Sequence, residues 1–392
     1  MCWERVIGQH HAKDILIAAI RRGCVAHAYC IWGPDGVGKD ALAIEFARVL
    51  NCSTPVVRDN CIEACDHCKD CLQISMLQHP NVQLIFSLPA ASKSGSNDDE
   101  SPILRLTDDQ ISQIQEQLLL KARNPYHDIS IPHATQIRIA AIRDVRRTLQ
   151  LSPPVGHGWR VVIISEADAM TLEAANAFLK TLEEPHARTT LILTTSRPDK
   201  LPPTVLSRCQ RIHCGYLDEE SIAMALVQRE QVPLERARIL AALAQGSYAR
   251  ALKLSLAADE DVLTDTAIHF LRLVLKQGRF RTELLTMIEQ QLNVYDRMQV
   301  ILLLRMILTW FHDAYRLSLH GSSAEPYLVF RHGNFRQALA RFVERFSPHS
   351  YDTAIAAVES AITAIENNAQ IPLTLVTLAI RLRRCMLPQS SL

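Results

Sequence analysis

The sequence predicts an α/β fold built on a parallel sheet, followed by an all-helical carboxy-terminal half, and three observations carry this prediction. A glycine-rich loop, Gly33–Asp40, lies between a short apolar run and an amphipathic helical pattern. Apolar strand-like runs then alternate with helical patterns over residues 25–215, as in a parallel sheet with crossover helices. From Tyr216 onward the strand signals stop, and helical stripes typical of a bundle continue almost to the end.

Composition limits the classes of protein that this chain can be. Its 392 residues and 48% hydrophobic content suit about two to three domains with real cores. The net charge of +1 gives no overall basic field, so any nucleic-acid contact would be local. We expect a soluble, cytoplasmic protein without membrane contact, because no signal peptide opens the chain and the most apolar helix, 300–308, is short and contains an arginine. The 11 cysteines then favour metal binding over disulfides.

The loop Gly33–Asp40 has the glycine and lysine spacing of a phosphate-binding P-loop. A strand is predicted before it at 27–32 and a helix after it at 41–50. The glycines would let successive backbone N–H groups converge on an anion, and the start of the helix adds the positive end of its dipole. The predicted nucleotide-binding residues are Gly33, Gly36, Gly38, Lys39 and Asp40.

Asp40 breaks the P-loop pattern at its eighth position. A working P-loop has Ser or Thr there, and the hydroxyl binds Mg²⁺. The carboxylate of Asp40 instead adds negative charge where phosphate oxygens would lie. Two interpretations stay open: a loop that still cradles phosphate, or a loop retained for its fold after catalysis was lost. Upstream, Val6–Gln9 would offer backbone contacts to an adenine or form a plain connecting turn.

A dense cysteine cluster follows the P-loop helix. It contains Cys52, Cys61, Cys65, Cys68 and Cys71. Four thiolates close a tetrahedral zinc site, and two-residue gaps let neighbouring cysteines share one metal ion. We predict a structural Zn²⁺ held by Cys52, Cys65, Cys68 and Cys71. Unligated cysteines or a redox pair are the alternatives, while Cys61 could replace Cys52 and His67 is a weaker competitor.

The segment at about 90–125 reads as an insertion. Residues 90–101 are polar, acidic and rich in Gly and Ser, which predicts a disordered surface loop. A helix is predicted to begin at Thr107–Gln110 and to reach about Arg123. Nothing in its sequence assigns chemistry to this insertion.

The run Trp159–Glu166 has the form of a Walker B strand, four apolar residues ending at a polar tip. A hydrolysing enzyme needs an acid at the first tip position to hold Mg²⁺ and a second acid beside it to orient water. Here the first position is Ser165, and only the second acid, Glu166, is present. The metal site is therefore defective twice, at Asp40 and at Ser165, and we expect negligible hydrolysis by this chain.

Further on, an amphipathic helix ends at Pro185, a strand is predicted at 190–195, and Ser207-Arg208-Cys209 closes the α/β part. From the physics of one residue alone, Arg208 would be a surface or salt-bridge arginine.

Together these motifs resemble the bacterial clamp-loader AAA+ ATPases of the DNA polymerase III complex. The resemblance covers about residues 5–250 in the family's order. It rests on Val6–Gln9, the P-loop, the cysteine cluster, Ala174–Pro185 and Leu201–Cys209. It implies an α/β AAA+ P-loop core with a parallel sheet, a small helical lid and an all-α collar domain for oligomerisation. The expected bounds are 1–215, 216–258 and 259–392, with a zinc module at about 52–71 inside the core.

Three departures separate this chain from the family's motor subunit, gamma/tau. The motor keeps Thr or Ser after the P-loop lysine, an Asp-Glu pair at Walker B, and a sensor arginine directly after a Gly-Ser pair. This chain has Asp40, Ser165-Glu166, and two residues inserted before Arg250. The departures are typical of a stator that hydrolyses poorly itself, although Lys39 leaves nucleotide binding open.

The resemblance also implies a mechanism and partners. Arg208 would act as an arginine finger in a neighbouring motor subunit's ATP site, and Glu166 would be a vestigial Walker B acid. The implied partners are the gamma/tau and delta subunits, the sliding clamp and, through the complex, primed DNA. ATP with Mg²⁺ would bind weakly or not at all. A motor ATPase like gamma/tau is the alternative, and a DNA-binding scaffold without any ATP-linked role is a third.

Overall fold

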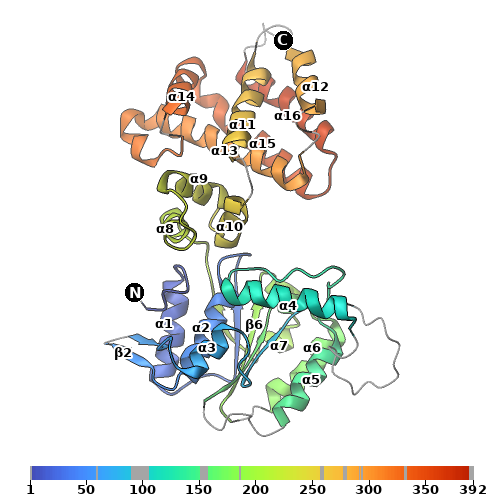
Figure 1. Cartoon of the computed structure of the whole chain (residues 1–392). Helices are drawn as coiled ribbons and strands as arrows, with labels where there is room; N and C mark the ends of the chain where they lie inside the picture. Colours follow the sequence, from blue (N-terminus) through green and yellow to red (C-terminus); the bar gives the residue numbers. More distant parts are fainter. Residues whose placement is uncertain are drawn as a thin grey trace. The chain divides into compact units, whose positions relative to one another are not determined.

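The fold is described from a computed structural model that covers most of the chain. The described residues are 2–58, 61–89, 106–150, 158–184, 187–256, 260–276, 280–290, 292, 295–330 and 333–387. The loop predicted at 90–101 lies outside them. The chain divides into two compact units, residues 1–225 with 246–250, and residues 226–245 with 251–392 (Figure 1).

The first unit is organised around a five-stranded sheet in the order β4-β5-β6-β1-β7, and every paired neighbour is parallel. Its strands are β1 (Ala28–Trp32), β4 (Val82–Ile85), β5 (Arg160–Ile164), β6 (Thr189–Thr195) and β7 (Gln210–His213). The register places Ile31 of β1 beside Thr194 of β6, so the carboxyl ends of the strands meet at one edge. The predicted parallel α/β core is confirmed.

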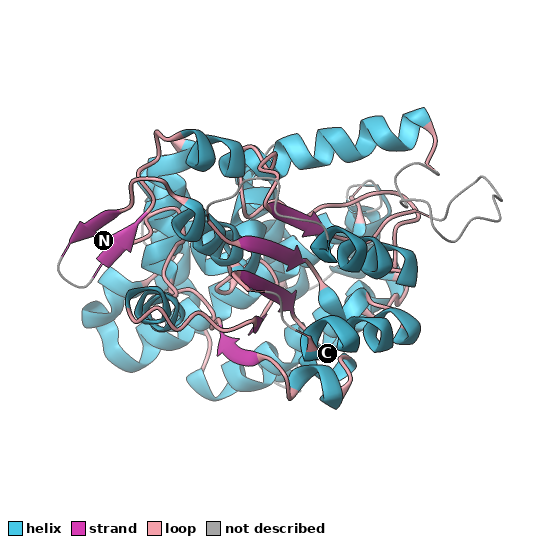
Figure 2. Ribbon diagram, turned by 90° about the horizontal axis from the view of Figure 1, so that it is seen from below, coloured by secondary structure: helices cyan, strands magenta, loops and turns pink. Residues whose placement is uncertain are grey.

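Helices cover both faces of this sheet (Figure 2). On one face, apolar side chains of the strands pack with helices α5 (Ile139–Gln150), α6 (Leu172–Glu183) and α7 (Pro203–Leu206), and Val162, Leu193 and Phe178 belong to this cluster. On the other face, helix α2 (Lys39–Asn51) packs against the sheet, and the ring of Phe46 meets that of Tyr29 edge-on at 5.4 Å. A sheet buried on both faces explains why its strands read as continuous apolar runs.

The helices of the first unit alternate with the strands. They are α1 (His10–Arg21), α2 (Lys39–Asn51), α3 (Lys69–Ser75), α4 (Asp108–Arg123), α5 (Ile139–Gln150), α6 (Leu172–Glu183) and α7 (Pro203–Leu206). A separate antiparallel hairpin, β2 (Val56–Arg58) with β3 (Cys61–Glu63), precedes α3. A capping box between Thr107 and Gln110 begins α4 where the sequence predicts it.

The described part of the second unit is entirely helical. Its helices are α9 (Leu234–Ala244), α11 (Glu260–Leu275), α12 (Phe280–Gln290), α13 (Arg297–His320), α14 (Gly333–Arg345), α15 (Tyr351–Glu366) and α16 (Ile371–Met386). Helices α8 (Glu219–Glu230) and α10 (Tyr248–Leu256) have residues in both units. Helix α13 packs with α11, α14 and α15. The predicted helical carboxy-terminal region is confirmed, while the bounds proposed for lid and collar stay a prediction.

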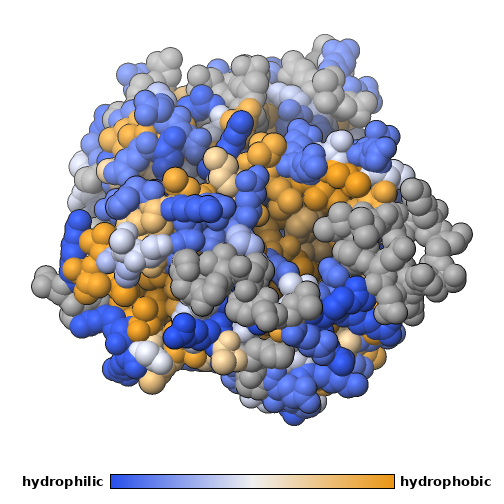
Figure 3. Space-filling model, turned by 60° about the horizontal axis from the view of Figure 1, so that its bottom comes forward, coloured by the Kyte–Doolittle hydropathy of each residue, from blue (hydrophilic) through white to orange (hydrophobic). Residues whose placement is uncertain are grey.

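Hydrophilic and hydrophobic residues are interspersed over the face of the molecule in Figure 3. Among the described residues, no helix combines the length and the apolar character that a membrane span requires.

Candidate functional site

The P-loop forms between the end of β1 and the start of α2. Gly36 and Gly38 have φ values of 74° and 98°, a region that favours glycine. A Cβ atom at Gly38 would lie 2.6 Å from the Tyr126 ring, so this loop also needs glycine for a close approach. The strand, glycine loop and helix predicted from the sequence are therefore all present, with Lys39 at the first turn of α2.

The side chain of Lys39 is turned back onto its own loop. Its Nζ donates to the carbonyl oxygens of Gly33 and Pro34, at 2.9 and 2.7 Å. Its side chain is 11% exposed and its Nζ lies 3.7 Å from Asp35 Oδ1. The ammonium group of Lys39 thus bonds within the P-loop itself.

Asp40 lies in a saturated polar site. Its Oδ2 accepts from Lys121 Nζ at 2.6 Å and from Ser165 Oγ at 2.7 Å, and its Oδ1 accepts from Thr194 Oγ1 at 2.6 Å. Burial alone would raise the pKa of Asp40. The ammonium of Lys121 and the three hydrogen bonds outweigh burial and lower that pKa to about 2. Asp40 is therefore a carboxylate whose lone pairs are used inside the protein.

The tip of β5 brings the two predicted Walker B positions to this site. Ser165 is buried and donates to Asp40, whereas Glu166 is exposed and has a left-handed backbone conformation with φ 51°. Loss of hydration and then the charges of Asp40, Asp128 and Asp168 raise the pKa of Glu166. Glu166 also lines the cavity beside the P-loop, so a carboxylate does stand at its mouth.

Two residues that contact the P-loop were missed from the sequence, Lys121 and Tyr126. Lys121 lies in the insertion at about 90–125 and Tyr126 directly after it, and the sequence assigned no chemistry to either. Lys121 lies 81 positions from Asp40, and no local pattern connects the two residues. The one signal that could have found it is Asp40 itself, because a buried carboxylate without a metal ion requires a cation.

The structure brings Cys52, Cys65, Cys68 and Cys71 together. Their Sγ atoms all lie within 4.8 Å of one another. Backbone N–H groups point at three of the sulfurs: that of Cys65 donates to Cys52 at 3.3 Å, that of Cys68 to Cys65 at 3.3 Å, and that of Cys71 to Cys68 at 3.4 Å. Burial would raise the pKa of Cys65, but hydrogen bonds from Thr54, His67 and Cys68 lower it to about 5. Four converging thiols with N–H donors to sulfur fit the requirements of a closed tetrahedral zinc site.

An ion network fixes this cluster to helix α2. Arg48, which is 1% exposed, donates to Glu45 Oε2 at 2.6 Å and also to Asp66, in the loop between Cys65 and Cys68. The P-loop helix and the cysteine loop are therefore held together by a buried guanidinium.

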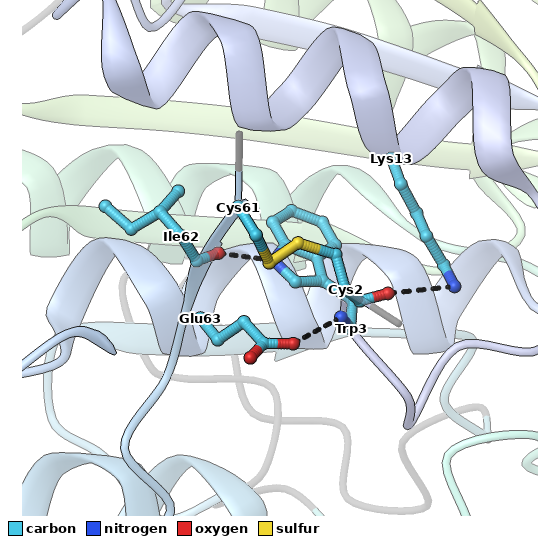
Figure 4. The surroundings of a disulfide bond; sticks show 6 residues. All are labelled: Cys2, Trp3, Lys13, Cys61, Ile62 and Glu63. Atoms are coloured by element: carbon cyan, nitrogen blue, oxygen red, sulfur yellow. Dashed lines mark hydrogen bonds between the residues drawn. A yellow bond between two sulfur atoms is a disulfide. The ribbon is translucent and has the colours of Figure 1, made fainter. Parts of the chain in front are cut away.

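Cys61 lies outside the cluster and forms a disulfide with Cys2, as Figure 4 shows. The Cα atoms of the pair are 5.9 Å apart. The amino-terminal segment is fixed to the hairpin here, because Trp3 donates through Nε1 to the Ile62 carbonyl at 2.8 Å and through its backbone N–H to Glu63 at 3.0 Å. The sequence favoured metal binding over disulfides and did not predict this bond. The reason is its separation of 59 residues, which leaves no local spacing pattern.

Arg208 lies two residues after the end of α7. Its side chain is 38% exposed and donates to Glu183 at 2.8 Å and to the Thr204 carbonyl at 3.0 Å. Glu183 belongs to the motif Ala174–Pro185, so one exposed ion pair joins it to the motif Leu201–Cys209. Such pairs contribute little to stability, about 0–1 kcal/mol.

The sequence profile of a family described as "DNA polymerase III, delta subunit" matches residues 8–217. The chain belongs to this family. The match covers the whole parallel sheet together with the P-loop, the cysteine cluster and Arg208. The resemblance to clamp-loader AAA+ subunits is thereby confirmed.

Curated relatives come from two branches of clamp-loader proteins. DNA polymerase III subunit delta' of Pseudomonas aeruginosa is 30% identical over 58% of this chain and 56% of its own length. DNA polymerase III subunit tau of Bacillus subtilis is 28% identical over 64% of this chain and 37% of its own length. A solved gamma subunit-related protein from Thermotoga maritima aligns with 95% of this chain and 99% of its own, at 17% identity and a TM-score of 0.39. The matched part thus spans less than two thirds of either curated relative.

Proposed function

We propose that this chain is the delta prime subunit of a DNA polymerase III clamp loader, a stator that supplies Arg208 to the ATP site of a neighbouring subunit. One observation carries the proposal. The side chain of Arg208 is partly exposed and is held by an exposed ion pair and one bond to a carbonyl group, while the chain's own P-loop has its metal-binding positions turned into an internal polar network. Relatives named delta' support it as well.

The proposed mechanism uses the permanent charge and planar fork of Arg208. A guanidinium contacts two phosphate oxygens at once and stabilises the charge that develops during phosphoryl transfer. To reach a phosphate, Arg208 exchanges its ion pair with Glu183 for the stronger anion. Its own P-loop takes no part in this step, and we expect weak or absent binding of ATP and Mg²⁺ there.

The proposed partners are the gamma/tau and delta subunits, the sliding clamp and, through the complex, primed DNA. The proposed metal is one structural Zn²⁺ held by Cys52, Cys65, Cys68 and Cys71, which would fix the loop that carries Asp66 beside helix α2. With all four positions filled by thiolates, the ion would have no open position for catalysis.

The test is Arg208→Ala in a complex reconstituted with its motor and delta subunits. An arginine finger accounts for about 10³–10⁵ in rate at the site it serves. Because a loader has several ATP sites, we expect a smaller but clear fall in clamp- and DNA-stimulated ATPase and in clamp loading. Arg208→Lys should restore little, since lysine cannot make the bidentate contact.

Two variants control this experiment. Arg22→Ala removes another exposed arginine of the same unit and should leave turnover unchanged. Glu183→Gln removes the ion-pair partner of Arg208 but keeps the finger, so turnover should persist. If the Arg208→Ala complex assembles and loads clamps at the unmodified rate, the stator mechanism is wrong.

The alternative is a gamma/tau-like motor that hydrolyses ATP itself. It is favoured by Lys39 and by relatives named tau, which match as much of the chain as those named delta'. Steady ATP turnover by the purified chain, lost in Lys39→Ala, would establish this alternative.

A further inference from the structure

The end of helix α4 and the loop after it enter the P-loop site. Lys121 is 3% exposed, and its Nζ donates to Asp40 Oδ2 at 2.6 Å and to the carbonyl of His127 at 2.8 Å. In a working P-loop the side chain at the position of Asp40 holds Mg²⁺. Here that side chain holds an ammonium group of the same chain.

The groups around Lys121 are those that would surround a metal ion. Asp40 is the eighth P-loop residue, Ser165 stands at the first tip position of β5, and Thr194 comes from the neighbouring strand β6. Ser165 and Thr194 both donate hydrogen bonds to the Asp40 carboxylate, as Lys121 does. A divalent cation could enter only by displacing a buried ammonium from its counter-charge, which like-charge repulsion opposes.

Tyr126 fills the space over the loop. Its ring occupies the position that a side chain of residue 38 would take, and it meets the ring of Tyr248 edge-on at 4.8 Å. Its hydroxyl accepts from the backbone N–H of Ile7 at 2.6 Å. Ile7 belongs to the segment Val6–Gln9, for which the sequence left open backbone contacts to an adenine or a plain connecting turn. The phenol therefore takes up one of the backbone donors that an adenine contact could use.

Little room remains beside these side chains. The cavity at the P-loop has a volume of about 80 Å³. Pockets for organic ligands typically have about 300–1,000 Å³. Lys121 at the end of α4 lines this cavity, and so do Tyr126, Asp128, Ile129 and Ile131 in the segment after α4.

We propose that Lys121 and Tyr126 act as an internal ligand of the P-loop and are the residues that exclude a magnesium nucleotide from this subunit. The ammonium takes the place of the metal ion, and the phenol blocks the approach of the nucleotide to the loop and to Ile7. This proposal rests on the part of the proposed function in which the chain binds nucleotide weakly or not at all, and it adds which residues prevent the binding. If only the metal ligands were missing, restoring them would restore nucleotide binding. If Lys121 and Tyr126 also occupy the site, these side chains must be removed as well.

The test compares two variants of the full chain by the anisotropy of a fluorescent ATP analogue with excess Mg²⁺. The repaired variant carries Asp40→Thr and Ser165→Asp, which restore the usual metal ligands. The repaired and opened variant adds Lys121→Ala and Tyr126→Ala. We expect the repaired variant to bind as poorly as the unmodified chain, and the opened one to bind at least tenfold more tightly.

Two outcomes overturn the proposal. In one, the repaired variant binds as tightly as the repaired and opened one, so the insertion excludes nothing. In the other, the opened variant keeps its circular dichroism and zinc content but gains no affinity. Neither outcome bears on Arg208, whose effect is measured on another subunit's ATPase.

A second measurement uses the unmodified chain, so it tests the proposal even if the substituted variants fail to fold. Acylation of lysines in the unmodified chain, read by mass spectrometry, should leave Lys121 protected compared with exposed Lys200. Added ATP and Mg²⁺ at millimolar concentration should change the labelling of neither Lys121 nor Lys39. A rise at Lys121 together with protection of Lys39 would mean that nucleotide displaces the internal ligand freely, which contradicts the proposal.

Discussion

Asp40 is stabilised by neighbouring side chains of the chain itself. Three donors from α4, from the tip of β5 and from β6 converge on its carboxylate, and the resulting pKa of about 2 lies below the ordinary 3.8. From the sequence, Asp40 left two interpretations open, a P-loop that still cradles phosphate or one retained for its fold after catalysis was lost. At the scale of one residue, the metal-binding hydroxyl of a working P-loop is replaced by a carboxylate that binds a buried lysine.

This environment predicts a pH-dependent contribution to stability. A carboxyl group whose pKa is lower in the folded state stabilises that state above its unfolded pKa, and the effect is lost as pH falls through the folded value. The window for Asp40 therefore runs from about pH 4 down to about pH 2. The shift corresponds to about 2 kcal/mol, since one pKa unit is worth about 1.4 kcal/mol.

We expect Asp40→Asn to lower the free energy of unfolding by about 2–4 kcal/mol at pH 7, because it also leaves Lys121 buried without a counter-charge. Urea unfolding at pH 7, 4 and 3 measures this, and the difference between the two proteins should narrow only below about pH 4. Asp199→Asn, at an exposed site, is the matched control. A difference that stays constant down to pH 3 would mean that Asp40 is not held as a carboxylate by Lys121.

Single elements of the fold were predictable where a pattern is local. The strand expected at 27–32 is β1 (Ala28–Trp32), and the strand expected at 190–195 is β6 (Thr189–Thr195). The apolar run 300–308 lies in the amino-terminal half of α13, whose start is fixed by the cap at Asp296.

Contacts between distant elements were not predictable. The disulfide joins the amino terminus to β3, and the Lys121–Asp40 pair joins α4 to α2. Neither has a spacing rule, because each depends on how the whole core folds. The cysteine cluster could be found from sequence for the opposite reason: three of its members lie within seven residues, so local geometry alone brings them together.

The positions of the cysteines in the fold predict which of them bind zinc. Cys52 follows the end of α2, while Cys68 and Cys71 lie at the start of α3 and Cys65 lies just before them. Cys61 is on the hairpin, paired with Cys2. We therefore expect Cys61→Ser to retain one zinc per chain and Cys52→Ser to lose it, as measured by metal analysis after dialysis.

Cys24→Ser, which removes an exposed cysteine outside both groups, controls for handling. The opposite result, in which the Cys61 variant loses zinc and the Cys52 variant keeps it, would show that the hairpin cysteine is the fourth ligand.

At the scale of the whole molecule, the polar side chains at the P-loop bond within the first unit, whereas the side chain of Arg208 is partly exposed. Lys39, Asp40, Lys121 and Tyr126 bond to groups of the same unit. Arg208, by contrast, is held by the Thr204 carbonyl and by Glu183, whose side chain is itself 49% exposed. An exposed ion pair is exchanged at little cost. Under the proposed stator function, Arg208 would act on another subunit, while the polar network around Asp40 stabilises the fold of this chain.

This difference between the P-loop side chains and Arg208 predicts a result for the assembled complex that would not be expected if the chain were a motor subunit. Lys39→Ala removes the side chain that a hydrolysing P-loop depends on, yet here it breaks only contacts within the loop, two bonds to carbonyl groups and an ion pair with Asp35. We expect complexes with Lys39→Ala to keep the clamp- and DNA-stimulated ATPase of the unmodified complex within the precision of the assay, because no hydrolysing site is lost. Assembly is checked by size-exclusion chromatography and turnover by phosphate release. Should Lys39→Ala instead lower complex turnover as much as Arg208→Ala does, the chain's own site must bind and hydrolyse ATP, and the stator role would have to be given up for that of a motor.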